Sequence, residues 1–245
     1  YVEADIMIST MNILNESQAG FALGEKEYYI DTDEHTTMIR EEYRKHIAKM
    51  FALCGFDDCE KKADVVLRLE TRLAKAAKNN VELRDPAANY TKVSIAQLQE
   101  MVPQMDWQVF LAAADIHTDS VALGQVEHLQ EAGKMLSDEP LDDLKTLFEW
   151  QVIDGAANSL NDDLFNQNFA FFGKILSGKK EPAQLWKRAV GIVNGVLGEG
   201  IGQEYVKKYF PEENKQRMLA LVRNLQKALG ERIAAQDWMD DSTKV

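Results

Sequence analysis

The chain has 245 residues, of which 45% are apolar and 28% are charged, a composition typical of a folded globular protein. A formal net charge of −12 argues against a nucleic-acid-binding surface, which needs a basic face. No apolar run approaches the roughly 18 residues of a membrane-spanning helix. Because no repeat, low-complexity tract or linker divides the sequence, we expect one domain. The chain begins at Tyr1 without an initiator methionine or a signal peptide, so we expect it to be part of a longer protein.

The N-terminal third predicts two short extended pieces and then two helices. Apolar residues alternate over the first 23 positions, which favours extended structure rather than a helix. Asp33 or Thr36 is placed to cap a first long helix, which Gly55 ends. A second helix runs from the Asp57-Asp58 pair to Asn79-Asn80. We expect a loop over residues 81–94, because Pro86 disfavours the α conformation at Asp85.

The middle of the chain predicts short helices and one further strand. Ser94 and Gln97 have the spacing of a capping box for a short helix that Pro103 ends, and Asp106 caps the next helix. Residues 120–124 predict a short strand. We expect this strand to pair with the N-terminal segment in a small antiparallel β element of two or three strands.

The C-terminal half predicts helices over 127–136, from Pro140, from Asn161-Asp162, from Pro182 and from Pro211. In the third of these, an aromatic row at four- and three-residue spacing is interpreted as core: Phe165, Phe169 and Phe172. With eight to ten helices and one small β element, the predicted fold class is mainly α, in a multi-helical single domain.

The stretch from Pro182 to Phe210 is rich in glycine. Gly191 and Gly195 lie four apart on the predicted helix, and we expect them to let another backbone approach closely. Three further glycines, at 198, 200 and 202, are expected to loosen the chain. A phosphate-binding loop is excluded, because there is no GxxxxGK[S/T] and a GxGxxG pattern starting at Gly198 would need glycine where Gln203 stands.

No catalytic, cofactor-binding or metal-ligating residue is predicted. The four histidines (His35, His46, His117 and His128) include no pair at H-x-x-x-H spacing. We interpret His46 as a surface or boundary residue and His117 as a possible helix C-terminal cap. Cys54 is interpreted as a buried small hydrophobe, with a local disulfide to Cys59 across the Gly55 turn as the alternative.

Five segments, in order, resemble one known family. They are Gly20–Tyr29 (GFALGEKEYY), Glu82–Pro86 (ELRDP) with Tyr90, Lys92–Gln99 (KVSIAQLQ) with Trp107 and Phe110-Leu111, Trp186–Arg188 with Val193–Gly195, Gly202, Tyr205-Val206 and Phe210, and Trp238–Asp240 with Thr243-Lys244. Together they resemble the mostly helical N-terminal domain of the neprilysin and endothelin-converting-enzyme family of zinc metallopeptidases. Ala22, Lys26 and Thr91 depart from the family pattern, and Thr91 stands where asparagine is usual.

The resemblance implies that residues 1–245 are a partial N-terminal helical domain, with the catalytic zinc domain in another part of the protein. Members of the family have an HExxH zinc site, a further glutamate ligand and a helical domain that closes over the cleft. The expected role is a non-catalytic, substrate-enclosing domain of a zinc metalloendopeptidase that hydrolyses peptides.

The expected partners are peptide substrates and the catalytic domain of the same chain. Zinc is expected in the parent protein but not in this segment, and no bound nucleic acid is expected. The family implies an extracytoplasmic location, either secreted, periplasmic or membrane-anchored facing outward. The alternative is a non-enzymatic helical peptide- or protein-binding module of the same ancestry. An HExxH motif in the parent sequence after Val245 would favour the peptidase.

Overall fold

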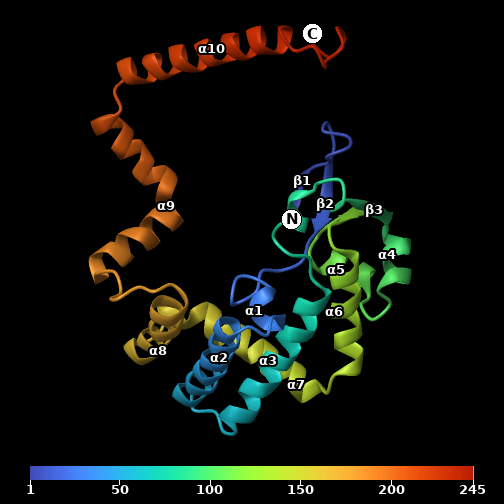
Figure 1. Ribbon diagram of the computed structural model, residues 1–245, viewed down its shortest axis with the longest axis vertical. Helices are drawn as coiled ribbons and strands as arrows, with labels where there is room; N and C mark the ends of the chain where they lie inside the picture. Colours follow the sequence, from blue (N-terminus) through green and yellow to red (C-terminus); the bar gives the residue numbers. More distant parts are fainter. Residues whose placement is uncertain (245) are drawn as a thin grey trace. The chain divides into compact units, whose positions relative to one another are not determined.

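The computed structural model describes residues 1–244, which form two compact units. The first unit is Tyr1–Pro182 and the second begins at Ala183. The prediction of a mainly α fold with a small β element is confirmed (Figure 1). The assignment of the whole chain to one domain stays a prediction. Each unit is described by itself.

The first unit contains all the described strands and most of the helices. In chain order its elements are β1 (Val2–Ala4), β2 (Asn12–Glu16), α1 (Glu27–Ile30), α2 (Glu34–Leu53), α3 (Cys59–Ala76), the 3-10 turn η1 (Glu82–Arg84), β3 (Thr91–Ser94), α4 (Ile95–Met101), α5 (Trp107–Ala113), β4 (Ser120–Leu123), α6 (Val126–Asp138), α7 (Leu141–Ala156), the 3-10 turn η2 (Ala157–Ser159), α8 (Asp162–Asn168) and the π-helical segment η3 (Phe169–Leu176).

The four strands form one mixed sheet in the order β1-β2-β4-β3. The predicted pairing of the N-terminal segment with residues near 120 is present, with Leu14 opposite Val121, but its predicted antiparallel direction is wrong. β2 and β4 run parallel, because helices and β3 carry the chain back to the same end of the sheet before β4 begins. β3, which we expected to be loop, adds an antiparallel edge with Val93 opposite Val121. The alternating β-branched residues Thr91 and Val93 are its sequence signal.

The main core lies among α1, α2, α3, α7, α8 and η3. Its α2 helix begins where the sequence predicts, because the Asp33 side chain accepts hydrogen bonds from the backbone N–H groups of His35 and Thr36. The fully buried side chains on α2 and the helices around it include Ile39, Tyr43, Ile47, Met50, Phe51, Val66, Leu69, Leu147 and Trp150. A second, smaller core joins the sheet to α4, α5 and α6 through Leu98, Val102, Trp107, Val121, Leu123 and Leu129.

The capping box at the start of α4 is confirmed. The Ser94 hydroxyl accepts from the Gln97 backbone N–H at 3.1 Å, and the Gln97 side chain accepts from the Ser94 backbone N–H at 2.9 Å. Both otherwise unpaired donors at this helix end are therefore satisfied.

We expect Ser94→Ala to lower the free energy of unfolding by about 1 kcal/mol, the usual cost of a lost N-cap. Chemical denaturation of the protein measures the change. Ser9→Ala, in the exposed loop between β1 and β2, is the control and should change stability by less than about 0.5 kcal/mol. Equal effects of the two substitutions would contradict the capping role.

The aromatic segment near residue 170 differs from the prediction. From Phe169 to Leu176 the backbone is π-helical, and Phe171, only 1% exposed, is the phenylalanine that reaches the core. Phe165, Phe169 and Phe172 are partly exposed, so the predicted row does not form the buried face, although Phe172 packs against the core. The wider π turn changes which residues share a face, and α-helical spacing therefore selected the wrong phenylalanines.

The second unit consists of α9 (Leu185–Tyr209) and α10 (Glu212–Ala234), neither of which has a buried residue. The predicted close backbone approach at Gly191 and Gly195 is not present among the described residues, because a Cβ placed on either glycine would have no atom within 4 Å. The helix begins at Leu185, so Pro182 precedes it instead of occupying its first turn. The segment 198–202 stays helical, with one non-helical residue at Leu197. No helix among residues 1–244 is long and apolar enough to cross a membrane.

Candidate functional site

A largely buried carboxylate in the first unit, that of Glu70 on α3, is held by hydrogen bonds from neighbouring helices. Tyr29 from α1 donates a hydrogen bond to Glu70 Oε2 at 3.1 Å, and Tyr43 from α2 donates to Oε1 at 3.2 Å. Trp150 Nε1 on α7 donates to the Tyr43 hydroxyl at 3.0 Å. The Tyr29 hydroxyl also accepts from the Leu23 backbone N–H at 3.3 Å. One carboxylate therefore joins four helices and the loop before α1.

Burial controls the protonation of this cluster. It raises the pKa of Glu70 to about 7, against the lowering effect of the two tyrosine hydrogen bonds. It also raises the pKa of Asp154 on α7 to about 6, and Asp154 Oδ1 is buried without a hydrogen-bond partner in the structure. The pKa of both tyrosines is raised, first by burial and then by the Glu70 charge. These groups hold the core together, and we assign them a structural role.

His46 is buried, which corrects its interpretation as a surface or boundary residue. Its side chain is 2% exposed, its ring stacks on Phe171 at 5.1 Å between centroids, and its Nδ1 lies 3.2 Å from Gln167 Nε2. Burial lowers the pKa of His46 to about 4, so the ring is neutral near pH 7. The sequence carried a signal for this, because positions 43, 46 and 50 share one face of a helix.

The remaining histidines and the cysteines are scattered. His128 is buried on α6, whereas His35 and His117 are exposed. His117 does not cap α5 as predicted, because the C-cap residue of this helix is Ala114. The His117 Nε2 atom lies 3.3 Å from Asp115 Oδ1. Cys54 is exposed, not buried, because α2 ends at Leu53 and turns outward at Gly55, and both cysteines are free thiols.

The same side chains do not come together as metal ligands in the part of the chain that the structure describes. Across residues 1–244, no three His, Cys, Asp or Glu side chains are grouped as a metal ion would require. The residues that the structure describes therefore do not fit a zinc site. That the chain alone binds no zinc stays a prediction.

A second polar cluster fixes the hairpin between β1 and β2. Asp5, only 2% exposed, accepts from the Met7 backbone N–H at 2.8 Å, from the Tyr90 hydroxyl at 2.7 Å and from Lys92 Nζ at 2.9 Å. Its backbone N–H donates to the Met11 carbonyl at 2.8 Å. The Lys92 ammonium, with the Tyr90 and Met7 donors, lowers the pKa of Asp5 to about 2. The charge is thus stabilised where it lies.

We expect Asp5→Asn to loosen this hairpin, since asparagine keeps one acceptor but loses the charge that holds Lys92. Amide hydrogen exchange at Met7 and Met11 should become faster by about tenfold. The difference in exchange between the two proteins should shrink as the pH falls through about 2, because Asp5 itself then becomes protonated and the stability from its lowered pKa is lost. Glu3→Gln, exposed on β1, is the control, and an equal change in exchange there would contradict the role of Asp5.

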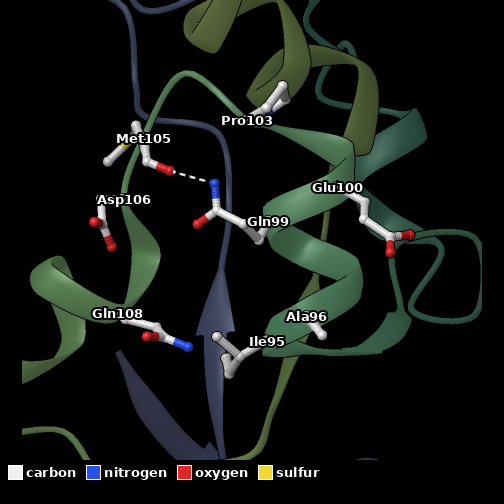
Figure 2. A pocket seen from close by; sticks show the side chains of 8 residues that line it. All are labelled: Ile95, Ala96, Gln99, Glu100, Pro103, Met105, Asp106 and Gln108. Carbon is white, nitrogen blue, oxygen red and sulfur yellow. Dashed lines mark hydrogen bonds between the residues drawn. The ribbon is translucent and has the colours of Figure 1, made fainter.

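An open groove lies between α4 and α5 in the first unit (Figure 2). It has a volume of about 680 Å³ and is lined by Ile95, Ala96, Gln99, Glu100, Pro103, Met105, Asp106 and Gln108. Gln99 ties the two helices together, because its Nε2 donates to the Met105 carbonyl at 2.9 Å and its Oε1 accepts from the Trp107 backbone N–H at 3.1 Å. The lining includes carboxylates but no basic side chain, so the groove suits neutral or cationic groups better than anions. It holds no base–nucleophile pair and is a binding feature at most.

The segments that carry the family resemblance have structural roles in the first unit. Tyr29, in the first segment, binds Glu70. In the second segment, Asp85 Oδ1 accepts from the backbone N–H groups of Ala87 and Ala88, and Asn89 Nδ2 donates to the Glu82 and Asp85 carbonyls. Thr91, where the family has asparagine, lies opposite Leu123 in the sheet. These residues bind a core carboxylate, form a turn and pair in the sheet, so all of them have structural roles.

The fold and its polar clusters define a mainly helical protein segment with a small mixed sheet and structural ionisable groups. All of its residues, 1–245, match the family model described as peptidase family M13. The chain belongs to this family, and the predicted relationship to neprilysin-like peptidases is confirmed.

Individual relatives agree with this assignment. The chain is 27% identical to mouse (Mus musculus) endothelin-converting enzyme-like 1, covering 99% of this chain and 32% of the relative. It is 26% identical to neprilysin-11 of Caenorhabditis elegans, and the match covers 100% of this chain and 31% of that relative. Its fold matches the crystal structure of Mycobacterium tuberculosis zinc metalloprotease ZMP1 in complex with an inhibitor, with a TM-score of 0.89, 31% identity and coverage of 100% and 37%. The chain spans about a third of the length of the curated relatives it matches.

Proposed function

We propose that residues 1–245 form a non-catalytic, substrate-enclosing part of a zinc metalloendopeptidase that hydrolyses peptides. The observation that carries this proposal is the match to peptidase family M13 along the entire segment, together with a shared fold with a zinc metalloprotease of which it covers 37%. The scattered histidines and cysteines of the first unit support a role without bond-breaking groups.

On this proposal, zinc and its ligands belong to a catalytic domain elsewhere in the same chain, and this segment is the partner of that domain. Enclosing a peptide restricts entry to flexible substrates, orients the scissile bond and removes water around it. Such positioning can contribute several kcal/mol to the lowering of a reaction barrier. The family resemblance further favours an extracytoplasmic location for the protein, facing peptides outside the cytoplasm.

The full-length protein provides the test. Zinc content by metal analysis and cleavage of peptides of increasing length would be measured for the intact protein and for a variant lacking residues 1–245. We expect the intact protein to hold zinc and to cleave short peptides but not folded proteins. The shortened variant should retain zinc, but the range of peptide lengths that it cleaves should change. The control is residues 1–245 alone, treated with chelator and reloaded with zinc, which should cleave nothing.

Two results would contradict the proposal. One is chelator-sensitive peptidase activity in residues 1–245 alone. The other is an intact protein whose range of peptide lengths is unaltered when this segment is removed.

A further inference from the structure

The helix α9 is interrupted at a single residue. Leu197 has φ −119° and ψ 24°, outside the helical region, whereas the residues on either side keep helical geometry from Leu185 to Tyr209. The helix is visibly bent in Figure 1. Sharp bends in helices arise at proline, at glycine-rich positions, at π turns or at inserted side chains. The interior of α9 contains no proline, so glycine is the available cause.

Glycine is concentrated around this point. Gly198, Gly200 and Gly202 follow Leu197 within five residues, and Gly191 and Gly195 precede it. Each weakens a helix relative to alanine, because the glycine backbone loses more freedom on becoming helical. None is required by crowding among the described residues, since an added Cβ at any of the five would meet no atom within 4 Å.

The neighbouring helix gives the contrast. α10 has a similar length, is equally exposed, contains one glycine at position 230 and has no interrupted residue. Exposure alone therefore does not bend a helix of this unit, and the bend coincides with the glycine cluster. In addition, α9 has no buried side chain, so the described residues provide no buried contact that would fix the angle between its two halves.

We propose that Leu197 and the glycines that follow it are a hinge. Residues 185–196 and 198–209 act as two helical segments whose mutual angle changes through the backbone dihedrals at Leu197, where the adjoining glycines weaken the helix. A few residues that absorb large φ and ψ changes are typical of hinges. The use of this hinge in opening and closing a substrate-enclosing domain rests on the proposed function. The bending itself does not.

The competing explanation is that the glycines allow a neighbouring part of the full-length protein to pack closely on α9. The two explanations predict opposite results for alanine substitution. At a hinge, alanine favours continuous helix, so the protein keeps or gains thermal stability and loses bending. At a close contact, alanine overpacks the interface and lowers the melting temperature.

The experiment uses the full-length protein with Gly198→Ala, Gly200→Ala and Gly202→Ala combined. Spin labels at the exposed positions 187 and 207, with other cysteines replaced, report the end-to-end distance of α9 by pulsed electron spin resonance. A straight helix over these 20 residues spans about 30 Å. We expect a broad distribution of label-to-label distances in the wild type. In the alanine variant the distribution should be at least twofold narrower and centred at about 30 Å. The matched control, Gly230→Ala in α10, should leave the distribution unchanged.

Peptide turnover by the alanine variant should fall by about tenfold if bending permits opening and closing. Unchanged peptide turnover together with a narrowed distance distribution would overturn the role of the hinge in opening and closing. A wild-type distribution as narrow as that of the alanine variant, or a melting temperature lowered by several degrees with unchanged distances, would overturn the hinge. The distance measurement does not depend on zinc or activity, so failure of the proposed function is distinguishable from failure of the hinge.

Discussion

Replacing Trp150 with alanine should lower the free energy of unfolding by about 3–5 kcal/mol, the range for large aromatic residues removed from a core. Trp150 is 1% exposed on α7, and its ring lies 6.0 Å from that of Tyr43 and 5.6 Å from that of His46, measured between centroids. Alanine leaves a cavity among these rings and removes the N–H that the Tyr43 hydroxyl accepts. A buried hydroxyl then loses a partner in addition to the lost packing.

Two further variants separate these contributions. Trp150→Phe keeps most of the packing but removes the donor, so it should cost about 1–2 kcal/mol, in the range of an unsatisfied buried group. Phe148→Ala lies on the same helix, but its side chain is 51% exposed, so it should cost less than about 1 kcal/mol. Urea denaturation of the protein followed by circular dichroism measures all three. Similar losses for Trp150→Ala and Phe148→Ala would show that Trp150 does not support the core as described.

The second large effect is a change in the pH dependence of stability when Glu70 becomes glutamine. Because burial raises the folded-state pKa of Glu70 from 4.5 to about 7, its contribution is fully present below about pH 4.5 and is lost as the pH rises through 7. A shift of this size corresponds to roughly 3 kcal/mol, and we treat that as an upper bound because part of the residue remains accessible to solvent.

Glu70→Gln stays neutral at every pH. We therefore expect the variant to gain roughly 1–3 kcal/mol relative to wild type, with the gain growing between pH 4.5 and about pH 7 and levelling off at higher pH. Taking the difference between the two proteins removes the contribution of Asp154, whose raised pKa acts in the same direction. Glu41→Gln, exposed on α2, is the matched control and should follow wild type. Parallel pH profiles for wild type and Glu70→Gln would contradict the buried position of this carboxylate.

Local features of the fold could be predicted from the sequence. Asp33, Ser94 and Asp106 were correctly placed at helix starts, because a cap is made by a side chain and backbone donors two or three residues away. Long helices such as α2 and α10 were also found from their apolar spacing. The parallel direction of β2 relative to β4 could not be predicted from the sequence. It depends on how the intervening helices return the chain, which local residue spacing does not encode.

The polar core was missed for a related reason. Glu70 lies four residues after Val66 and three before Leu73, so a carboxylate on an apolar helix face was a readable signal. Its partners Tyr29 and Tyr43, however, come from other helices, and only the tertiary structure shows that its oxygens are satisfied. The family resemblance, by contrast, came from five short segments spread along the chain, and the family model matches residues 1–245.

The parallel pairing of β2 with β4 has a consequence for the order of events when the chain folds. Leu14 meets Val121 across more than a hundred residues, and closing so long a loop has an entropic cost that local helices do not share. We therefore expect α2 and α3 to form early and the sheet to form late, which is typical of slow, non-local strand pairing. During synthesis on a ribosome, β2 would lack its neighbouring strand until β4 has emerged. During that interval its unpaired edge would be open to other chains, and assistance from a chaperone would matter most then.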